Sequence, residues 1–212
     1  MADGESRAFL CSPFALPTPP NAVLFHGTHP WYLDGFDEVA LRSRLAEDPS
    51  AGVGEIGLDR LRDRNIPPRM RETFERQLEI AAEFRRPVVL HGAKCWGEVV
   101  KACRPFAGKI PSFLFHGFSR SDGLLPDIAA INGFVSIGPA LLNDHAVNYR
   151  ELAKKVPIDR LLVESDRTIE NTAEVPPVDE IAAFLAELRG MTCDALAAAL
   201  ESNASRFVSF LI

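Results

Sequence analysis

Residues 52–59 read Gly-Val-Gly-Glu-Ile-Gly-Leu-Asp, an apolar run that carries one carboxylate, Glu55, near its middle. A run of this kind suits a strand that is buried on both faces of a sheet. Residues 67–84 follow, with two prolines at their start and apolar side chains at helical spacing. Pro87–Leu90 is again short and apolar. Strand, helix and strand in this order predict a parallel sheet covered by helices.

Short apolar runs and segments with helical spacing alternate in the same way along the rest of the chain. Towards the end, residues 178–188 and 196–207 show helical spacing, and Thr192 is a predicted N-cap. Periodicity alone does not separate an open doubly wound sheet from a closed barrel, and barrels of the eight-stranded kind usually need about 250 residues. The candidate strands are Arg7–Ser12, Ala22–Gly27, Gly52–Leu58, Pro87–Leu90, Ser112–Phe115, Phe134–Ile137 and Leu161–Val163.

The composition is that of an ordinary soluble globular protein, with 47% hydrophobic and 25% charged residues. The net charge of -6 means that bulk charge does not attract nucleic acid. A phosphate-bearing substrate would need a local positive site, from a metal ion or a few placed Lys and Arg side chains. No apolar run reaches the ~18 residues that a membrane span needs, and the polar N-terminus lacks a signal-peptide core. We therefore expect a cytoplasmic protein that does not contact membranes.

Metal-binding residue types occur at the ends of several candidate strands. Glu55 lies in the third strand, His91 and His116 end the fourth and fifth, and Glu164 and Asp166 follow the seventh. A single histidine at a strand end is more often a structural residue, but four strands here deliver such groups. In a parallel barrel these ends converge on one face, where active sites lie. Imidazole and carboxylate together suit zinc, manganese and iron, and the pattern predicts a metal site.

Six motifs, taken in order, resemble those of the TatD-like metal-dependent hydrolase family of deoxyribonucleases. The similarity covers about residues 7 to 210, nearly the whole chain. The motifs are Gly-Thr-His-Pro-Trp-Tyr at 27–32, Gly-Glu-Ile-Gly-Leu-Asp at 54–59, Pro-Val-Val-Leu-His at 87–91, Phe-His-Gly-Phe-Ser at 115–119, Glu-Ser-Asp at 164–166 and Asn203 with Phe207.

The resemblance implies an α/β fold, a TIM-type (β/α) barrel with seven of eight strands present, as a single domain over residues 1–212. It implies hydrolysis of phosphodiester bonds by metal-activated water, typically in DNA, or in a small phosphodiester. The cofactor would be one or two divalent ions, Mg, Mn or Zn.

The resemblance also assigns the metal ligands. Glu55 would be the bridging carboxylate and a catalytic residue, while His91 and His116 would hold one metal ion. Asp166 would bind the other ion and, as the second catalytic residue, take a proton from the attacking water.

Two further residues would bind the substrate, according to the resemblance. His29 and Lys94 lie near enough to the motifs to contact a substrate phosphate. The family more often has Arg two residues after the fourth-strand histidine, where this chain has Ala93.

A short basic run and two tryptophans have two interpretations each. Arg60, Arg62 and Arg64 form either a solvated loop of mixed charge or a contact for a substrate phosphate. Trp31 and Trp96 follow His29 and His91 closely; they either pack in the core or stack on a base.

The chain departs from the family in one respect: it has no His-x-His on a first strand, and its first histidine is His26. Three explanations stay open, namely a start further upstream, a site with one metal ion, and a non-catalytic binding relative. Hydrolysis of another bond type is a further alternative, because a fold does not fix its chemistry. A missing strand would leave two unpaired sheet edges through which the protein could self-associate.

Overall fold

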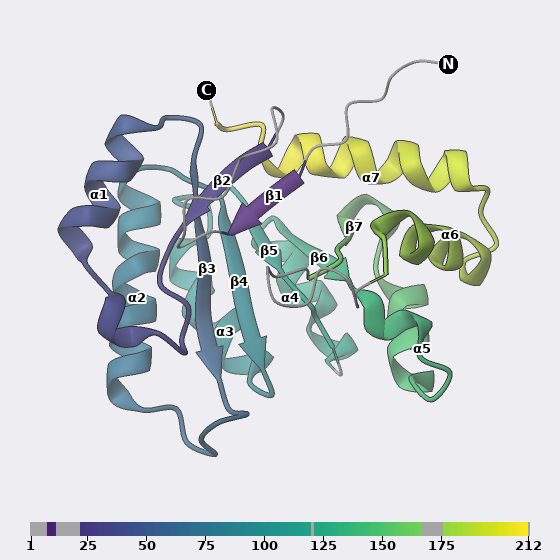
Figure 1. Ribbon diagram of the computed structural model, residues 1–212, viewed down its shortest axis with the longest axis horizontal. Helices are drawn as coiled ribbons and strands as arrows, with labels where there is room; N and C mark the ends of the chain where they lie inside the picture. The colour runs from purple at the N-terminus through teal and green to yellow at the C-terminus, as the bar shows by residue number, and fades with distance from the viewer. Residues whose placement is uncertain (1–7, 12–21, 120, 167–175, 212) are drawn as a thin grey trace.

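The computed structural model describes residues 8–11, 22–119, 121–166 and 176–211. Seven parallel strands form one sheet in chain order, each hydrogen-bonded to the next (Figure 1). Among the described residues no pairing joins the first strand to the last, so the barrel is open on that side. The strands are β1 (Ala8–Cys11), β2 (Ala22–His26), β3 (Gly52–Asp59), β4 (Val88–Ala93), β5 (Phe113–Phe115), β6 (Gly133–Ile137) and β7 (Leu161–Val163).

The seven predicted strands and the TIM-type architecture are confirmed. The edges of the sheet are β1 and β7, and neither has a second strand neighbour among the described residues. Self-association through these edges stays a prediction.

Seven α-helices occur in the described parts of the chain, and none of them is long and apolar enough to cross a membrane. Figure 1 shows α1 and α2 beside β3, and α7 across the end of the sheet from which β3 and β4 start. The Thr192 hydroxyl accepts a hydrogen bond from the Ala195 amide, which confirms the predicted N-cap of α7. The helices are α1 (Glu38–Glu47), α2 (Pro68–Glu83), α3 (Trp96–Cys103), α4 (Leu125–Ala130), α5 (Val147–Lys155), α6 (Val178–Leu188) and α7 (Cys193–Phe207).

The fourth strand is longer than the sequence pattern predicts. β4 continues to Ala93, three residues past Leu90, so His91 lies inside the strand and not at its end. Pairing with β3 explains the difference, because the register with β3 continues past the apolar run, with Gly57 opposite His91 and Asp59 opposite Ala93. A Cβ at Gly57 would lie 2.0 Å from the His91 carbonyl oxygen, so only glycine allows this approach.

A small apolar layer fills the inside of the sheet, apart from the main core between sheet and helices. Phe207, at the end of α7, belongs to this layer and is fully buried. Its ring centroid lies 5.8 Å from those of Phe25 and Phe134. The strand residues of the layer are Phe25, Val89, Leu114, Phe134 and Leu162.

A polar layer lies directly above the apolar one. Side chains in a strand alternate between faces with period two, so the residue two positions further along points to the same side. That position holds His91 after Val89 in β4 and His116 after Leu114 in β5. It holds Ser136 in β6 and Glu164 after β7. The sheet thus presents four polar side chains at one level, towards the carboxyl ends of the strands.

We expect Phe207→Ala to lower the free energy of unfolding by about 3–5 kcal/mol, because it empties a fully buried ring position. Urea denaturation followed by circular dichroism measures this loss. Phe210→Ala is the matched control: that ring is 46% exposed, and we expect a change within about 0.5 kcal/mol. Equal losses in the two variants would contradict a packed interior layer.

Candidate metal centre

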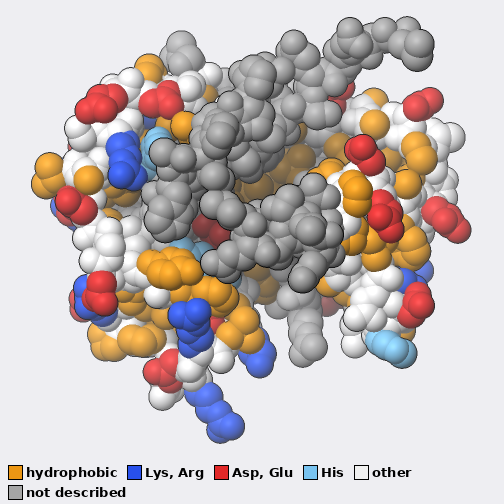
Figure 2. Space-filling model, in the orientation of Figure 1, with side chains coloured by type: hydrophobic (Ala, Val, Ile, Leu, Met, Phe, Trp, Pro, Cys, Tyr) orange, Lys and Arg blue, Asp and Glu red, His pale blue; other side chains and the backbone are white. Residues whose placement is uncertain are grey.

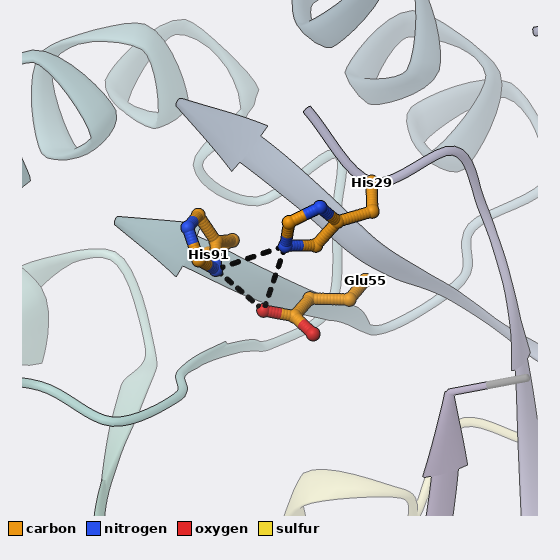
Figure 3. Close-up of side chains that lie close together, drawn as sticks. All are labelled: His29, Glu55 and His91. Carbon is orange, nitrogen blue, oxygen red and sulfur yellow. Dashed lines mark hydrogen bonds and ion pairs between the residues drawn. The ribbon is translucent and has the colours of Figure 1, made fainter. Parts of the chain in front are cut away.

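Side chains from three neighbouring strands and one loop converge on a single carboxylate oxygen. Glu55 Oε1 of β3 lies 2.8 Å from His91 Nδ1 of β4 and 3.5 Å from His116 Nε2, just after β5. His29 lies in the loop that follows β2, with its Nε2 4.0 Å from the same oxygen and 3.2 Å from His91 Nδ1 (Figure 3). All four side chains are less than one quarter exposed.

A local irregularity in β3 aims Glu55 at this point. The register between β3 and β4 shifts between Val53 and Ile56. Gly54 faces the interior, since a Cβ there would lie 2.8 Å from Val89 Cβ. In a regular strand Glu55 would then point outwards, but the extra residue turns it to the interior as well. Bulges of this kind occur beside active sites because they re-aim a side chain.

Asp59 contacts the ring nitrogen of His91 that faces away from Glu55. Its fully buried carboxylate accepts a hydrogen bond of 2.9 Å from His91 Nε2–H. The same Oδ2 accepts from Trp31 Nε1–H at 2.9 Å, and Oδ1 accepts from the Leu61 amide. A proton fixed on Nε2 leaves Nδ1 as the nitrogen that can offer its lone pair to a cation.

Glu164 plays the same part for His116. Its Oε2 accepts a hydrogen bond of 2.7 Å from His116 Nδ1–H and also bonds the Ser136 hydroxyl. The proton is therefore held on Nδ1, and Nε2 faces Glu55. His91 and His116 thus present opposite ring nitrogens to one point, each fixed by an outer carboxylate.

His29 has the reverse arrangement. Its Nδ1 accepts a hydrogen bond of 3.1 Å from the Trp31 backbone amide, so Nδ1 carries no proton. Burial, with Glu55 opposing it, lowers the pKa of His29 to about 4, so the ring is neutral and its one proton lies on Nε2. This nitrogen points into the cluster as a donor. His29 is close enough to be a ligand, but its hydrogen bonding makes it a donor to an anion.

The charges in the cluster support a carboxylate in its ionised form. Burial alone would raise the pKa of Glu55, but His116, His91 and His29 outweigh it and hold the pKa at about 2. At His116 burial alone would lower the pKa, but Glu164 and Glu55 outweigh it and raise the pKa well above the ordinary value. Negative and positive groups are therefore paired at one buried point.

The spacing of these atoms fits a cation. Zinc bonds of about 2.0–2.2 Å in a tetrahedron place ligand atoms roughly 3.4 Å apart. Glu55 Oε1 lies 2.8 Å from His91 Nδ1 and 3.5 Å from His116 Nε2. Asp166 Oδ1 adds a further oxygen 3.6 Å from His116 Nε2, on a side chain that is 64% exposed. The arrangement can hold a divalent ion and leaves an open side for water and substrate.

The predicted metal residues Glu55, His91, His116 and Asp166 are brought together by the structure. Of the two predicted substrate-binding residues, His29 reaches this cluster. Lys94 lies on the exposed turn after β4, and its side chain has no hydrogen bond or ion pair within the described part of the chain.

Sequence reasoning missed the roles of Asp59 and Glu164. It included Asp59 as the last residue of the motif at 54–59 and gave neither Asp59 nor Glu164 a separate role. A period-two pattern was available in β3, since Glu55, Gly57 and Asp59 share one face beyond the irregularity. Nothing comparable marks Glu164, because its partner His116 is 48 residues away.

A family model and several known proteins match most of the chain. The family described as TatD related DNase matches residues 15–209. The uncharacterized metal-dependent hydrolase YabD of Bacillus subtilis is 26% identical over 78% of this chain and 68% of its own length. The 3′–5′ ssDNA/RNA exonuclease TatD of Erwinia billingiae is 28% identical over 85% of this chain and 75% of its own length. The crystal structure of YJJV, a TatD homolog from Escherichia coli K12, superimposes with a TM-score of 0.76 at 25% identity, covering 88% of this chain and 76% of that one.

We expect Asp59→Asn to weaken binding of Zn²⁺ roughly 10- to 100-fold, because the amide removes the charge that fixes the His91 tautomer. Isothermal titration calorimetry of the metal-free protein measures this change. The control is Asp63→Asn, an exposed carboxylate in the loop that follows β3, and this variant should bind Zn²⁺ as the wild type does. Wild-type affinity in Asp59→Asn would show that the buried carboxylate does not position His91.

Proposed function

The chain belongs to the TatD-related DNase family, and on that premise we propose that it is a metal-dependent hydrolase of phosphodiester bonds in nucleic acid. The observation that carries the proposal is the pair of imidazoles, His91 and His116, each fixed by an outer carboxylate and facing the same oxygen of Glu55. The description of a relative as an exonuclease on single-stranded DNA and RNA supports nucleic acid as the substrate.

We assign Glu55, His91 and His116 as the ligands of a divalent ion, with Asp166 at the open side of the site. A bound ion would lower the pKa of a coordinated water and polarise a phosphoryl oxygen. Asp166 is placed to accept the proton of the attacking water. The exposure of its side chain lets that proton pass to solvent. His29 is placed to donate from Nε2–H to a non-bridging phosphate oxygen, as expected for a substrate-binding residue.

Among the candidate ions, the ligand types favour zinc or manganese over magnesium, which prefers oxygen ligands and retains its waters. Within the described residues one group of three metal-binding side chains lies together, namely His29, Glu55 and His91, and it shares Glu55 and His91 with the proposed ligand set. We therefore propose a site that works with one tightly held ion, as one of the explanations for the absent His-x-His motif requires.

The proposal predicts that Glu55→Gln abolishes cleavage. We expect wild-type protein with Mn²⁺ or Zn²⁺ to release nucleotides from single-stranded DNA, and the variant to be slower by at least roughly 100-fold, the scale of loss of a positioned catalytic group. Glu75→Gln, on the exposed face of α2, is the control and should retain the wild-type rate. A wild-type protein that binds these ions and cleaves neither DNA nor RNA would refute the proposed activity and leave a non-catalytic relative or a hydrolase of another bond type.

A second prediction separates the donor from the ligands. His91→Gln should lose Zn²⁺ binding, whereas His29→Gln should bind Zn²⁺ as the wild type does. His29→Gln should nevertheless lower kcat/KM on single-stranded DNA roughly 10- to 100-fold, the cost of one hydrogen bond to a charged group. Calorimetry and steady-state kinetics on the same preparations measure the two effects. Loss of Zn²⁺ binding in His29→Gln would instead make His29 a ligand.

A further inference from the structure

Two aromatic side chains stand exposed beside the metal centre. Trp31 and Tyr32 directly follow the Pro after His29 and are 38% and 62% exposed. Their ring centroids lie 4.9 and 5.9 Å from that of His29. Figure 2 shows hydrophobic and basic side chains gathered beside a histidine on the lower left of the face. Neighbouring apolar rings that stand exposed beside a polar cluster are typical of ligand-binding surfaces.

Trp31 is held in place by the metal centre itself. Its indole N–H donates to Asp59 Oδ2, the oxygen that also accepts from His91 Nε2–H. The Trp31 and His91 ring centroids are 6.2 Å apart. The indole plane is therefore fixed relative to the ligands. A group stacked on it would lie within one nucleotide's reach of a phosphate at the cluster.

The face of Trp31 already accepts a flat group. The guanidinium carbon of Arg62 lies 4.0 Å from the centroid of the indole ring. Arg62 is exposed, and its side chain makes no ion pair or hydrogen bond with the residues that the structure describes. At an exposed site such a cation–π contact is weak. A planar ring can replace it, and the freed guanidinium can then turn to a phosphate.

We propose that Trp31, with Tyr32 and Arg62 around it, forms a subsite for one unpaired nucleobase next to the scissile phosphate. The inference rests on the proposed function and adds to it the side chains that hold a base of the substrate. Stacking on an aromatic side chain tolerates any base, because every base has a π-face. It requires a base that is not already stacked in a duplex, so the subsite selects single strands. With a net charge of -6, the protein cannot hold a strand by bulk charge, so local stacking and Arg62 supply the attraction.

The chain contains two tryptophans, which gives the subsite its own optical signal. Trp96 is 4% exposed in the core, so a ligand that stacks on the surface changes the fluorescence of Trp31 alone. We titrate (dT)8 into the full chain with EDTA present, so that no bond is cleaved. Quenching is expected in the wild type and in Trp96→Phe, and absent in Trp31→Phe.

The affinity for (dT)8 should fall roughly 10- to 100-fold in Trp31→Ala, as measured by fluorescence anisotropy of a labelled strand. Leu61→Ala is the matched control, because this side chain is 57% exposed in the loop that carries Arg62 and should not alter binding. An octamer of abasic sugar-phosphate units, with the same charge and no bases, should bind wild type and Trp31→Ala equally and without quenching.

Quenching that persists in Trp31→Phe, or equal affinities of wild type and Trp31→Ala for (dT)8, would overturn the subsite. The outcome is independent of catalysis. Trp31-dependent binding of (dT)8 without hydrolysis under Mn²⁺ or Zn²⁺ would support the subsite and refute the proposed activity. Hydrolysis with the same kcat/KM in wild type and Trp31→Ala would support the activity and refute the subsite.

Discussion

The hydrogen bond between His91 and the buried carboxylate of Asp59 is the contact on which the site's geometry depends. It fixes the proton on His91 Nε2 and so turns Nδ1 towards Glu55. The same carboxylate oxygen anchors the indole of Trp31, which connects the pocket wall to the ligands. A fully buried carboxylate is stable only with partners, and Asp59 has three, all donors. The interaction is thus part of the core as well as part of the centre.

The three histidines differ in what their outer ring nitrogens meet, and that difference gives them different chemistry. His91 and His116 each donate to a carboxylate from the outer ring nitrogen, so the inward nitrogen is the one that can give up its proton to bind a cation. His29 accepts from a backbone amide, which leaves an inward proton. In the proposed site, one cluster therefore combines two groups suited to a cation with one group suited to an anion. A hydrolase of phosphodiesters needs both, because the metal ion and the phosphate oxygens meet at the same point.

The sequence was sufficient for the order of the strands and for the residues that meet at the centre. Apolar runs predicted all seven strands, because parallel strands that are buried on both faces consist almost entirely of apolar residues. The predicted end of β4 was wrong. The apolar pattern stops at Leu90, but backbone pairing with Gly57 extends the strand through His91. The inward turn of Glu55 depends on a register shift in β3 that no residue type signals. The ring nitrogen that carries the proton in each histidine could not be predicted either, since it depends on hydrogen-bond partners up to 48 residues away.

The open barrel is compatible with the proposed metal centre because of where the proposed ligands lie. Glu55, His91 and His116 belong to or directly follow β3, β4 and β5, which are consecutive neighbours in the sheet. Their mutual placement depends on the two strand pairings between them and on the apolar layer beneath, not on closure between β1 and β7. Glu164 reaches His116 from β7 across the inside of the sheet, next to Ser136 of β6, so curvature alone brings it there. The proposed one-ion centre therefore needs the curved part of the sheet from β3 to β7, and the described residues contain all of these strands.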